Sequence, residues 1–251
     1  MTDYAGSNLA RVLSGTTDGV KLIFGSAKGR ELAAGFYGDW PLNRATYAGL
    51  DDFFKHLADT CGPRLSVDNP LRILEMGAGT GGTTKRLLPL LAKLGMPVEY
   101  TFTDLSPSLV AQARKKWGKE YPFMRFATHD IEKPPAPEFV GTQHLILASN
   151  AVHATRSLRD STQHIHSMLR SDGFLLLVEM TRPMYWVDLV FGLFEGWWMM
   201  ADGREHVITH EKRWAAEMQA SGYGHVNWLD GASEESQIWK LIIAAADPKS
   251  R

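Results

Sequence analysis

The chain has 251 residues, of which 44% are hydrophobic and 22% are charged, the composition of an ordinary globular protein with one large domain. It excludes a disordered chain, a collagen-like repeat and a small disulfide-stapled scaffold. The formal net charge of -1, without a basic block along the chain, argues against nucleic acid as a partner.

The cysteine content and the apolar segments indicate where in the cell the protein is located. Cys61 is the single cysteine, so no intramolecular disulfide and no cysteine-rich metal site can form. The N-terminus has no basic stretch leading into an apolar segment, and the apolar stretch 186–201 is interrupted by Asp188 and Glu195. We therefore expect a cytoplasmic protein with no membrane contact.

The first part of the chain is an arm or lid followed by a long helix. Residues 1–42 carry scattered Gly, Ser, Asp and Thr between short apolar pieces, which predicts an N-terminal arm of short helices. From Asn43, apolar residues recur at helical spacing, so we expect a helix capped by Asn43 that ends near residues 60–63. The main domain is expected over residues 43–251.

The next hundred residues alternate short apolar runs with helical patterns, as is typical of a doubly wound, mostly parallel sheet covered on both faces. The expected strands are 72–76, 98–103, 123–128, 144–149 and 173–179, and the expected helices between them are 81–94, 106–117 and 157–170.

The last part of the chain begins with an aromatic stretch over residues 185–200, followed by a helix near 211–220. Two final runs, 225–229 and 237–245, are separated by the polar turn 230–233 and predict a closing hairpin. These two strands bring the expected sheet to seven strands, in one compact domain.

A glycine-rich loop follows the first predicted strand directly. Gly77, Gly79 and Gly82 satisfy the spacing of a dinucleotide-binding loop, in which glycines allow a tight turn and the close approach of a ligand to the backbone. The pattern alone is weak, so a nicotinamide dinucleotide remains an alternative at this point.

Acidic residues at three successive strand ends favour S-adenosylmethionine (SAM). Glu75 precedes the loop, where a carboxylate suits the ammonium group of a zwitterion and would repel a pyrophosphate. Asp104 ends the second strand, from which it can reach ribose hydroxyls, and Asp130 follows the third, beside Ile131, which can pack on adenine. Each carboxylate taken singly also fits a helix cap, a turn cap or a buried ion pair.

Several segments of the chain resemble class I SAM-dependent methyltransferases, specifically the C-methyltransferase domain of fungal polyketide synthases. The similarity covers roughly residues 43–246 and is carried by residues 74–84 (LEMGAGTGGTT), 149–155 (SNAVHAT), 177–181 (LVEMT), 191–198 (FGLFEGWW) and 202–204 (DGR). The resemblance implies a Rossmann-like α/β fold with an N-terminal helical arm and an aromatic lid. Including the residues inferred above, the expected cofactor-binding set is Glu75, Gly77, Ala78, Gly79, Thr80, Asp104, Leu105, Asp130, Ile131 and Asn150.

The resemblance also implies a reaction in polyketide secondary metabolism. Such domains transfer a methyl group from SAM, leaving S-adenosylhomocysteine (SAH), to the α-carbon of a β-ketoacyl chain on an acyl carrier protein. By the matching motifs, His153 would be the general base and Glu179 the residue that orients it. Imidazole has a pKa near 6.5 and can accept a proton at neutral pH, which agrees with this assignment.

The aromatic stretch carries more apolar surface than a connector needs, and it predicts the walls of a substrate tunnel or lid as well as core packing. The expected substrate-binding residues are Tyr185, Trp186, Phe191, Phe194, Trp197 and Trp198. We assign no metal to the histidine pairs His164/His166 and His206/His210, because a metal site needs convergent ligands.

Three alternatives stay open at the level of sequence: an O- or N-methyltransferase acting on a small molecule, a non-catalytic module with the same fold, and an enzyme that uses a nicotinamide cofactor. Both a free-standing enzyme acting in trans and a part of a larger polypeptide fit the chain.

Overall fold

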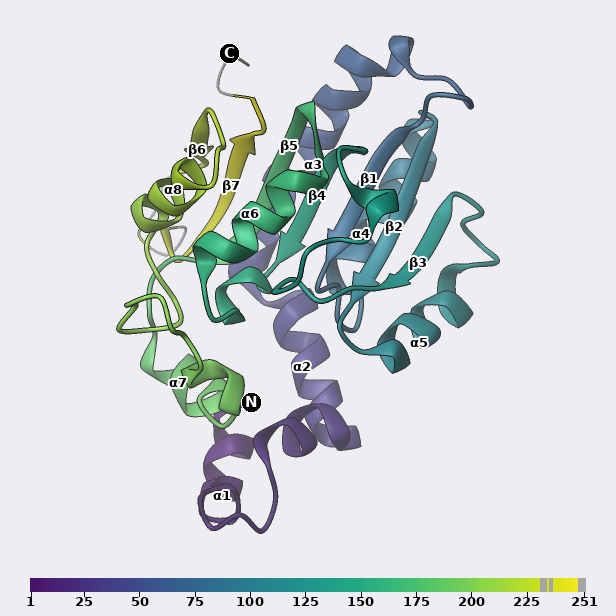
Figure 1. The fold of residues 1–251 in the computed structure, drawn as a ribbon. Coiled ribbons are helices and arrows are strands. Elements are labelled where there is room, and N and C mark those ends of the chain that lie inside the picture. Colours follow the sequence, from purple (N-terminus) through teal and green to yellow (C-terminus); the bar gives the residue numbers. More distant parts are fainter. Residues whose placement is uncertain (231–233, 235–236, 248–251) are drawn as a thin grey trace.

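The structure is a computed structural model that describes residues 1–230, 234 and 237–247. Seven strands form one mixed sheet in the order β3-β2-β1-β4-β5-β7-β6 (Figure 1). Their bounds are β1 (Leu71–Met76), β2 (Val98–Asp104), β3 (Met124–Thr128), β4 (Gln143–Ser149), β5 (Leu169–Met180), β6 (Val226–Trp228) and β7 (Trp239–Ala245).

Strands β1 to β5 pair in parallel, and β7 pairs antiparallel with both β5 and β6. The expected doubly wound sheet and closing hairpin are therefore confirmed. Of the polar turn expected at 230–233, residues 231–233 lie outside the described residues. The carboxyl ends of the parallel strands share one edge of the sheet, where open α/β sheets bind their ligands.

Helices cover both faces of the sheet. The helices in chain order are α1 (Thr2–Leu13), η1 (Lys21–Gly25, a π-helix), α2 (Ala27–Asp39), α3 (Pro41–Cys61), η2 (Gly62–Arg64), α4 (Gly82–Leu94), α5 (Pro107–Trp117), η3 (Pro137–Phe139), η4 (Val152–Ala154), α6 (Leu158–Met168), α7 (Tyr185–Phe191), η5 (Glu195–Trp198) and α8 (Glu211–Ala220). No helix within the described ranges combines the length and the apolar character needed to cross a bilayer.

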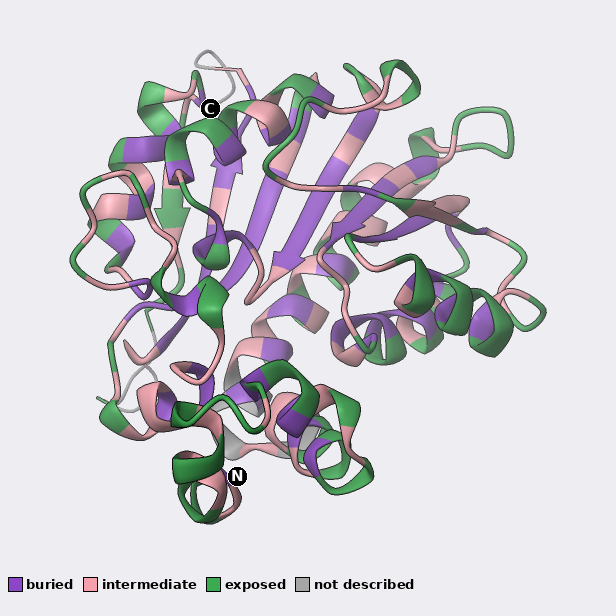
Figure 2. Cartoon of the chain, turned by 60° about the horizontal axis from the view of Figure 1, so that its bottom comes forward, coloured by how far each residue is buried: buried purple, intermediate pink, exposed green. Residues whose placement is uncertain are grey.

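The core is divided between the two faces because side chains alternate along each strand. Ile73 packs in a cluster with α3, α4 and α5, whereas its neighbour Leu74 packs in a second cluster with α6 and α8. Figure 2 shows the buried strands between helices whose outer faces are exposed. This two-sided burial explains why the strands read as nearly continuous apolar runs.

Local signals set the ends of the central helices. Ser106 and Ser157 accept hydrogen bonds from the backbone N–H groups of Leu109 and Asp160, at 3.4 and 3.2 Å, and so cap α5 and α6. Gly95 ends α4 in the left-handed conformation, with φ +67, which glycine adopts without steric cost.

The long N-terminal helix starts differently from the expectation. Helix α3 begins at Pro41, whose fixed φ suits the first helical position, so the prediction of a start capped by Asn43 is wrong. Asn43 lies inside the helix, and its side-chain amide donates to the carbonyls of Phe36 at 2.7 Å and Tyr37 at 3.0 Å. Asn43 thus joins the end of α2 to α3.

The N-terminal arm packs against the aromatic segment. Figure 1 shows α1 and α2 together with α7 beyond the carboxyl ends of the parallel strands. The ring of Phe24 lies 5.5 Å from that of Phe194, and the ring of Phe36 lies 5.5 Å from that of Phe191. The expected N-terminal helical arm therefore covers the edge of the sheet at which ligands bind.

Candidate active site

The glycine loop between β1 and α4 has a backbone with positive φ at three of its glycines. Gly77, Gly79 and Gly81 have φ of +57, +58 and +80, a region that other residues enter only at a steric cost. A Cβ on Gly77 would lie 2.5 Å from the Cβ of Ala151. The loop therefore packs closely on the segment that follows β4.

Asp104 holds this loop in place. Its Oδ2 accepts from the backbone N–H of Gly79 at 2.8 Å, and its Oδ1 accepts from the N–H of Ser106 at 2.8 Å. Each carboxylate oxygen has a second lone pair. Asp104 can thus keep the loop in shape and still accept hydrogen bonds from ribose hydroxyls.

Glu75 is a buried acid beside the loop. Its Oε2 accepts from the hydroxyl of Thr84 at 2.5 Å and from that of Tyr100 at 2.7 Å. Burial raises the pKa of Glu75 from 4.5 to about 7, and these hydrogen bonds offset part of the rise. Such an acid sits close to the balance between its neutral and charged forms at physiological pH.

A cavity of about 620 Å³ lies along the loop, and we call it the loop cavity. It is lined by Phe24, Arg30, Tyr37, Tyr47, Glu75, Gly77, Ala78, Gly79, Thr80, Gly82, Thr83, Leu109, Gln112, Ser149 and Asn150. Six of the predicted cofactor residues are brought together here: Glu75, Gly77, Ala78, Gly79, Thr80 and Asn150. The volume is in the range of ordinary ligand sites.

The other four predicted cofactor residues lie outside that lining. Asp104 holds the loop, and Leu105 is exposed. Asp130 accepts from the N–H of Glu132 at 3.0 Å and pairs with Lys133. The side chain of Ile131 lies 3.5 Å from the position of a Cβ on Gly77, so it packs beside the loop.

SAM fits the chemistry of the loop cavity. A Cβ on Gly79 would have no neighbour nearer than 3.9 Å, so the backbone there is open to a ligand. The lining includes an acid, Glu75, and a cation, Arg30, which are the two charges that a zwitterionic amino-acid moiety requires. The pyrophosphate of a dinucleotide in the same cavity would be repelled by Glu75.

His153 and Glu179 form a buried pair at the same edge of the sheet. His153 lies in η4, the turn after β4, and Glu179 lies near the end of β5. Their side chains meet with His153 Nδ1 2.7 Å from Glu179 Oε2, and both are buried. This pairing leaves Nε2 of His153 without a hydrogen bond to any described residue.

A second cavity, the His153 cavity, has a volume of about 190 Å³ and mostly apolar walls. Phe191, Phe194 and Trp197, three of the six predicted substrate residues, line it. The other three do not: Tyr185 and Trp198 are exposed, and Trp186 packs with Phe36 and Trp40. Three of the six expected substrate residues therefore line this cavity and three lie elsewhere, because helical spacing turns neighbouring side chains in different directions.

The two cavities share three residues, Phe24, Tyr37 and Asn150. Phe24 and Tyr37 come from the N-terminal arm, and sequence reasoning missed both because no local motif marks them. Burial raises the pKa of Tyr37, and the nearby charge of Glu179 raises it further, so Tyr37 keeps its proton at neutral pH. Asn150 has φ 48 and accepts from the indole N–H of Trp239 at 2.8 Å.

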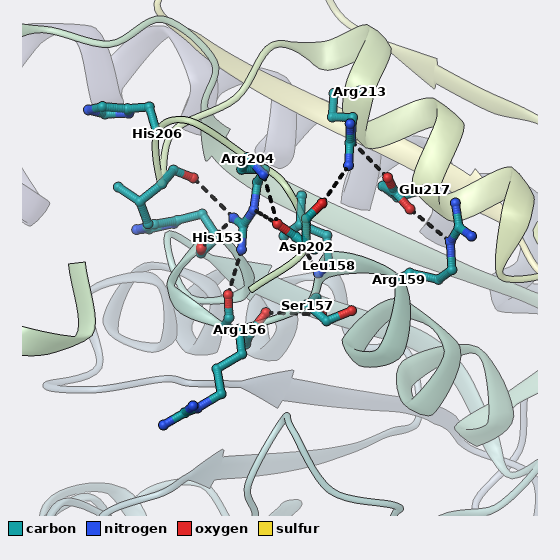
Figure 3. A network of polar contacts seen from close by, with 12 residues as sticks. His153, Arg156, Ser157, Leu158, Arg159, Asp202, Arg204, His206, Arg213 and Glu217 are labelled. Carbon is teal, nitrogen blue, oxygen red and sulfur yellow. Dashed lines mark hydrogen bonds and ion pairs between the residues drawn. The ribbon is translucent and has the colours of Figure 1, made fainter. Parts of the chain in front are cut away.

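Arg204 holds the turn that carries His153 (Figure 3). Its guanidinium donates to the carbonyls of His153 at 2.8 Å and Thr155 at 2.6 Å, and to Asp202 at 2.8 Å. Asp202 also accepts from the N–H of Leu158 at the start of α6, at 2.9 Å. Only 2% of the Arg204 side chain is exposed, so Arg204 supports the structure of this turn from inside the protein.

In each of the two histidine pairs, one ring is held by a partner other than a histidine. His166 Nε2 bonds to the carbonyl of Ala246 at 2.9 Å, and His206 Nε2 bonds to Asp188 at 2.9 Å. Within the described part of the chain, no group of three or more His, Cys, Asp or Glu side chains is placed to hold a metal ion.

Strand order and loop define the class of the protein. A seven-stranded sheet with this order, a glycine loop after β1 and an acid at the end of β2 are typical of class I SAM-dependent methyltransferases, and the chain is one. In agreement, residues 74–175 match the family model described as "Methyltransferase domain".

Comparisons narrow the family further. The chain is 62% identical over 246 residues to 3-methylorcinaldehyde synthase of a Phoma species and 59% identical to the non-reducing polyketide synthase dbaI of Emericella nidulans. Each match covers 98% of this chain and 9% of the relative, so the chain spans a small part of these large proteins.

Solved structures agree with the sequence comparison. The citrinin polyketide synthase CMeT domain superposes with a TM-score of 0.92 at 50% identity, over 98% of this chain and 64% of that one. The trans-methyltransferase CalH in complex with SAH superposes with a TM-score of 0.79 at 27% identity, over 95% of this chain and 64% of that one. The chain belongs to the C-methyltransferase domains of fungal non-reducing polyketide synthases.

Proposed function

We propose that this domain transfers a methyl group from SAM to the α-carbon of a β-ketoacyl chain carried on the phosphopantetheine arm of an acyl carrier protein. The observation that carries the proposal is a buried His–Glu pair, with 2.7 Å between His153 Nδ1 and Glu179 Oε2, beside an apolar cavity that adjoins the loop cavity. Methyl transfer to carbon needs such a base, because the proton of the carbon acid must first be removed. Methyl transfer to a neutral amine does not, because the amine already has a free electron pair.

His153 is the general base in this proposal. The α-carbon between a ketone and a thioester is a weak acid, and Nε2 of His153 takes its proton. Glu179 accepts the hydrogen bond of Nδ1, which fixes the tautomer that leaves Nε2 free and stabilises the imidazolium once it forms. The resulting enolate carbon is the nucleophile.

SAM, when bound, would supply a methyl group attached to a positively charged sulfur. On transfer the electron pair of the sulfur–methyl bond stays on sulfur, and SAH is the product. Asp104 would accept from the ribose hydroxyls and Asp130 from the adenine amino group, while Ile131 would pack on the ring and Leu105 beside it. Gly77, Ala78, Gly79, Thr80 and Asn150 would supply the backbone and polar walls of the site.

The arm and the aromatic residues shelter the reaction. Phe191, Phe194 and Trp197 give the acyl chain apolar walls and exclude water, which would otherwise protonate the enolate. Tyr37 is protonated and lies between the two cavities, where its hydroxyl can donate to the enolate oxygen. We accordingly propose that residues 1–42 serve as a lid on a methyltransferase domain formed by residues 43–251.

The kind and the length of the relatives support the proposal of a carrier-bound substrate. The relatives are more than ten times the length of the matched segment, and one of them is a non-reducing polyketide synthase. A carrier protein is the means by which such a synthase would present an acyl chain to this domain. The length of the relatives also supports a chain that works as part of a larger polypeptide. We further propose the cytoplasm as its location.

The test is to incubate the protein with methyl-carbon-13 SAM and an α-unsubstituted β-ketoacyl pantetheine thioester, and to locate the label by NMR and mass spectrometry. Label on the α-carbon is expected. Label on oxygen would replace the proposal with O-methylation. If the free thioester gives no label, the same incubation with the acyl chain on a carrier protein decides, and its failure would overturn the proposal.

A further inference from the structure

The charges in the loop cavity are few. Glu75 is the acid and Arg30 the cation among the described residues that line it. Arg30 belongs to the N-terminal helix α2, more than forty residues before Glu75 in the sequence. An arm residue therefore supplies the positive charge of a cavity whose acid comes from the sheet.

The hydrogen bonds of Arg30 leave one edge of its guanidinium free. Nη1 donates to the carbonyl of Gly25 at 2.9 Å and to that of Phe24 at 3.2 Å, which are the last carbonyls of η1. Nε and Nη2 form no hydrogen bond to the described residues. That edge presents two parallel N–H groups, the geometry that pairs with both oxygens of a carboxylate.

The position of Arg30 is set by the packing of α2 on η1. Ser26 caps α2 by accepting from the N–H of Gly29 at 2.9 Å. A Cβ on Gly29 would lie 2.3 Å from the carbonyl oxygen of Ile23, so the first turn of α2 rests directly on η1. Further along the same helix, Tyr37 lies 3.8 Å from the position of a Cβ on Gly82, at the start of α4. Both ends of α2 are thus held against their neighbours.

The amino-acid moiety of SAM carries an ammonium group and a carboxylate. An acid such as Glu75 attracts the ammonium and repels the carboxylate, so a cation elsewhere in the lining of the same cavity would orient the moiety. We propose that Arg30 binds the carboxylate of the SAM methionine moiety, so that the N-terminal arm completes the cofactor site. This inference rests on the proposed use of SAM and adds a residue that directly contacts it.

The experiment compares two ligands by isothermal titration calorimetry. SAH has the carboxylate, and decarboxylated SAH keeps the ammonium group but lacks the carboxylate. The wild-type protein should bind SAH about tenfold more tightly than the decarboxylated analogue. Arg30→Gln should weaken SAH by about tenfold and leave the affinity for the decarboxylated analogue within a factor of two.

The second ligand separates recognition from folding. Arg30 also holds η1, so its loss can disturb the arm, and a disturbed arm would weaken both ligands equally. Equal losses, or unchanged SAH affinity, would overturn the inference while leaving SAM use intact. A wild-type protein that binds neither ligand would overturn the proposed function itself.

Lys28→Met is the matched control. Lys28 is an exposed cation on the same helix, pairs with Glu31 at 3.2 Å and does not line the cavity. Its removal changes the charge of α2 by the same amount, and SAH affinity should stay at the wild-type value. A loss equal to that of Arg30→Gln would mean that the charge of the arm, and not a specific contact, draws SAH to the site.

Discussion

His153 Nδ1 and Glu179 Oε2 lie 2.7 Å apart although the two residues belong to different strand ends. The contact exists because β4 and β5 are parallel neighbours in the sheet, so their carboxyl ends lie side by side. The pair is buried, so its hydrogen bond is shielded from competing water.

The first prediction concerns this pair. Glu179→Gln keeps the size of the side chain but removes the charge that stabilises the imidazolium, and turnover should fall by about a hundredfold or more. SAH affinity, measured by calorimetry, should stay within a factor of two. His153→Ala should abolish turnover in the same assay. Wild-type rates in either variant would remove the proposed base or its partner.

The second prediction concerns Arg204. Arg204→Met removes the hydrogen bonds to His153, Thr155 and Asp202 and leaves buried carbonyls unpaired, which should cost about 2–4 kcal/mol of unfolding free energy in urea. Turnover should fall at least tenfold, because the turn that carries His153 loses its support. The control is Arg159→Met, whose side chain is 57% exposed in its pair with Glu217 and should cost less than about 1 kcal/mol.

The third prediction is a pH dependence from Glu75. Its pKa is about 7 in the folded chain against an ordinary value of 4.5, so between these values the folded state binds more protons than the unfolded state. Stability therefore falls as pH rises from about 4.5 through about 7, by roughly 3 kcal/mol for this group alone. Glu75→Gln should flatten this slope in urea unfolding at pH 5 to 8 without SAM. An identical slope in the variant would place its origin elsewhere.

The fourth prediction compares two glycines. Gly77→Ala and Gly95→Ala both place an alanine at positive φ, and this backbone strain alone should cost each variant about 1–2 kcal/mol in thermal unfolding. Only at Gly77 does the new Cβ meet a neighbour, the Cβ of Ala151 at 2.5 Å, whereas nothing lies within 4 Å at Gly95. Gly77→Ala should therefore weaken SAH binding at least tenfold in calorimetry, while Gly95→Ala binds as the wild type does. Equal affinities would show that the loop tolerates displacement.

The fifth prediction separates two adjacent tryptophans. Trp197 is 6% exposed, stacks on Phe191 with 5.7 Å between ring centroids and donates to Asp188 at 3.1 Å. Trp197→Ala should cost about 3–5 kcal/mol of stability and most of the turnover. Trp198 is 58% exposed, and Trp198→Ala should cost less than about 1 kcal/mol and leave the rate close to wild type. Similar losses at both positions would contradict the assignment of Trp197, and not Trp198, to the cavity wall.

Most elements of the fold could be predicted from local patterns. The strand expected at 98–103 is observed as Val98–Asp104, and the helix expected at 81–94 as Gly82–Leu94. These segments are buried on both faces or carry a clear helical stripe, so their apolar pattern identifies them. The start of helix α3 is predicted too late, because the cap rule favours Asn43 as the N-cap, whereas the proline two residues before Asn43 begins the helix.

Part of the site was also readable in the sequence. Glu75 and Asp104 stand at the ends of neighbouring parallel strands, and the glycine loop that follows Glu75 contacts Asp104 through the N–H of Gly79. Because parallel strands place their carboxyl ends at one edge, sequence position alone predicts that these groups converge. The pairing of His153 with Glu179 follows the same rule.

The class of fold, the glycine loop and the acids at the strand ends can be inferred from the amino-acid order, because each depends on the chemistry of a short segment. The folded chain was needed to see that Phe24, Arg30 and Tyr37 of the arm reach the cavities, and that Arg204 holds the His153 turn. The same holds for which aromatic residues face the site. These contacts join segments far apart in the chain, and their partners are selected by packing in three dimensions, which no local pattern records.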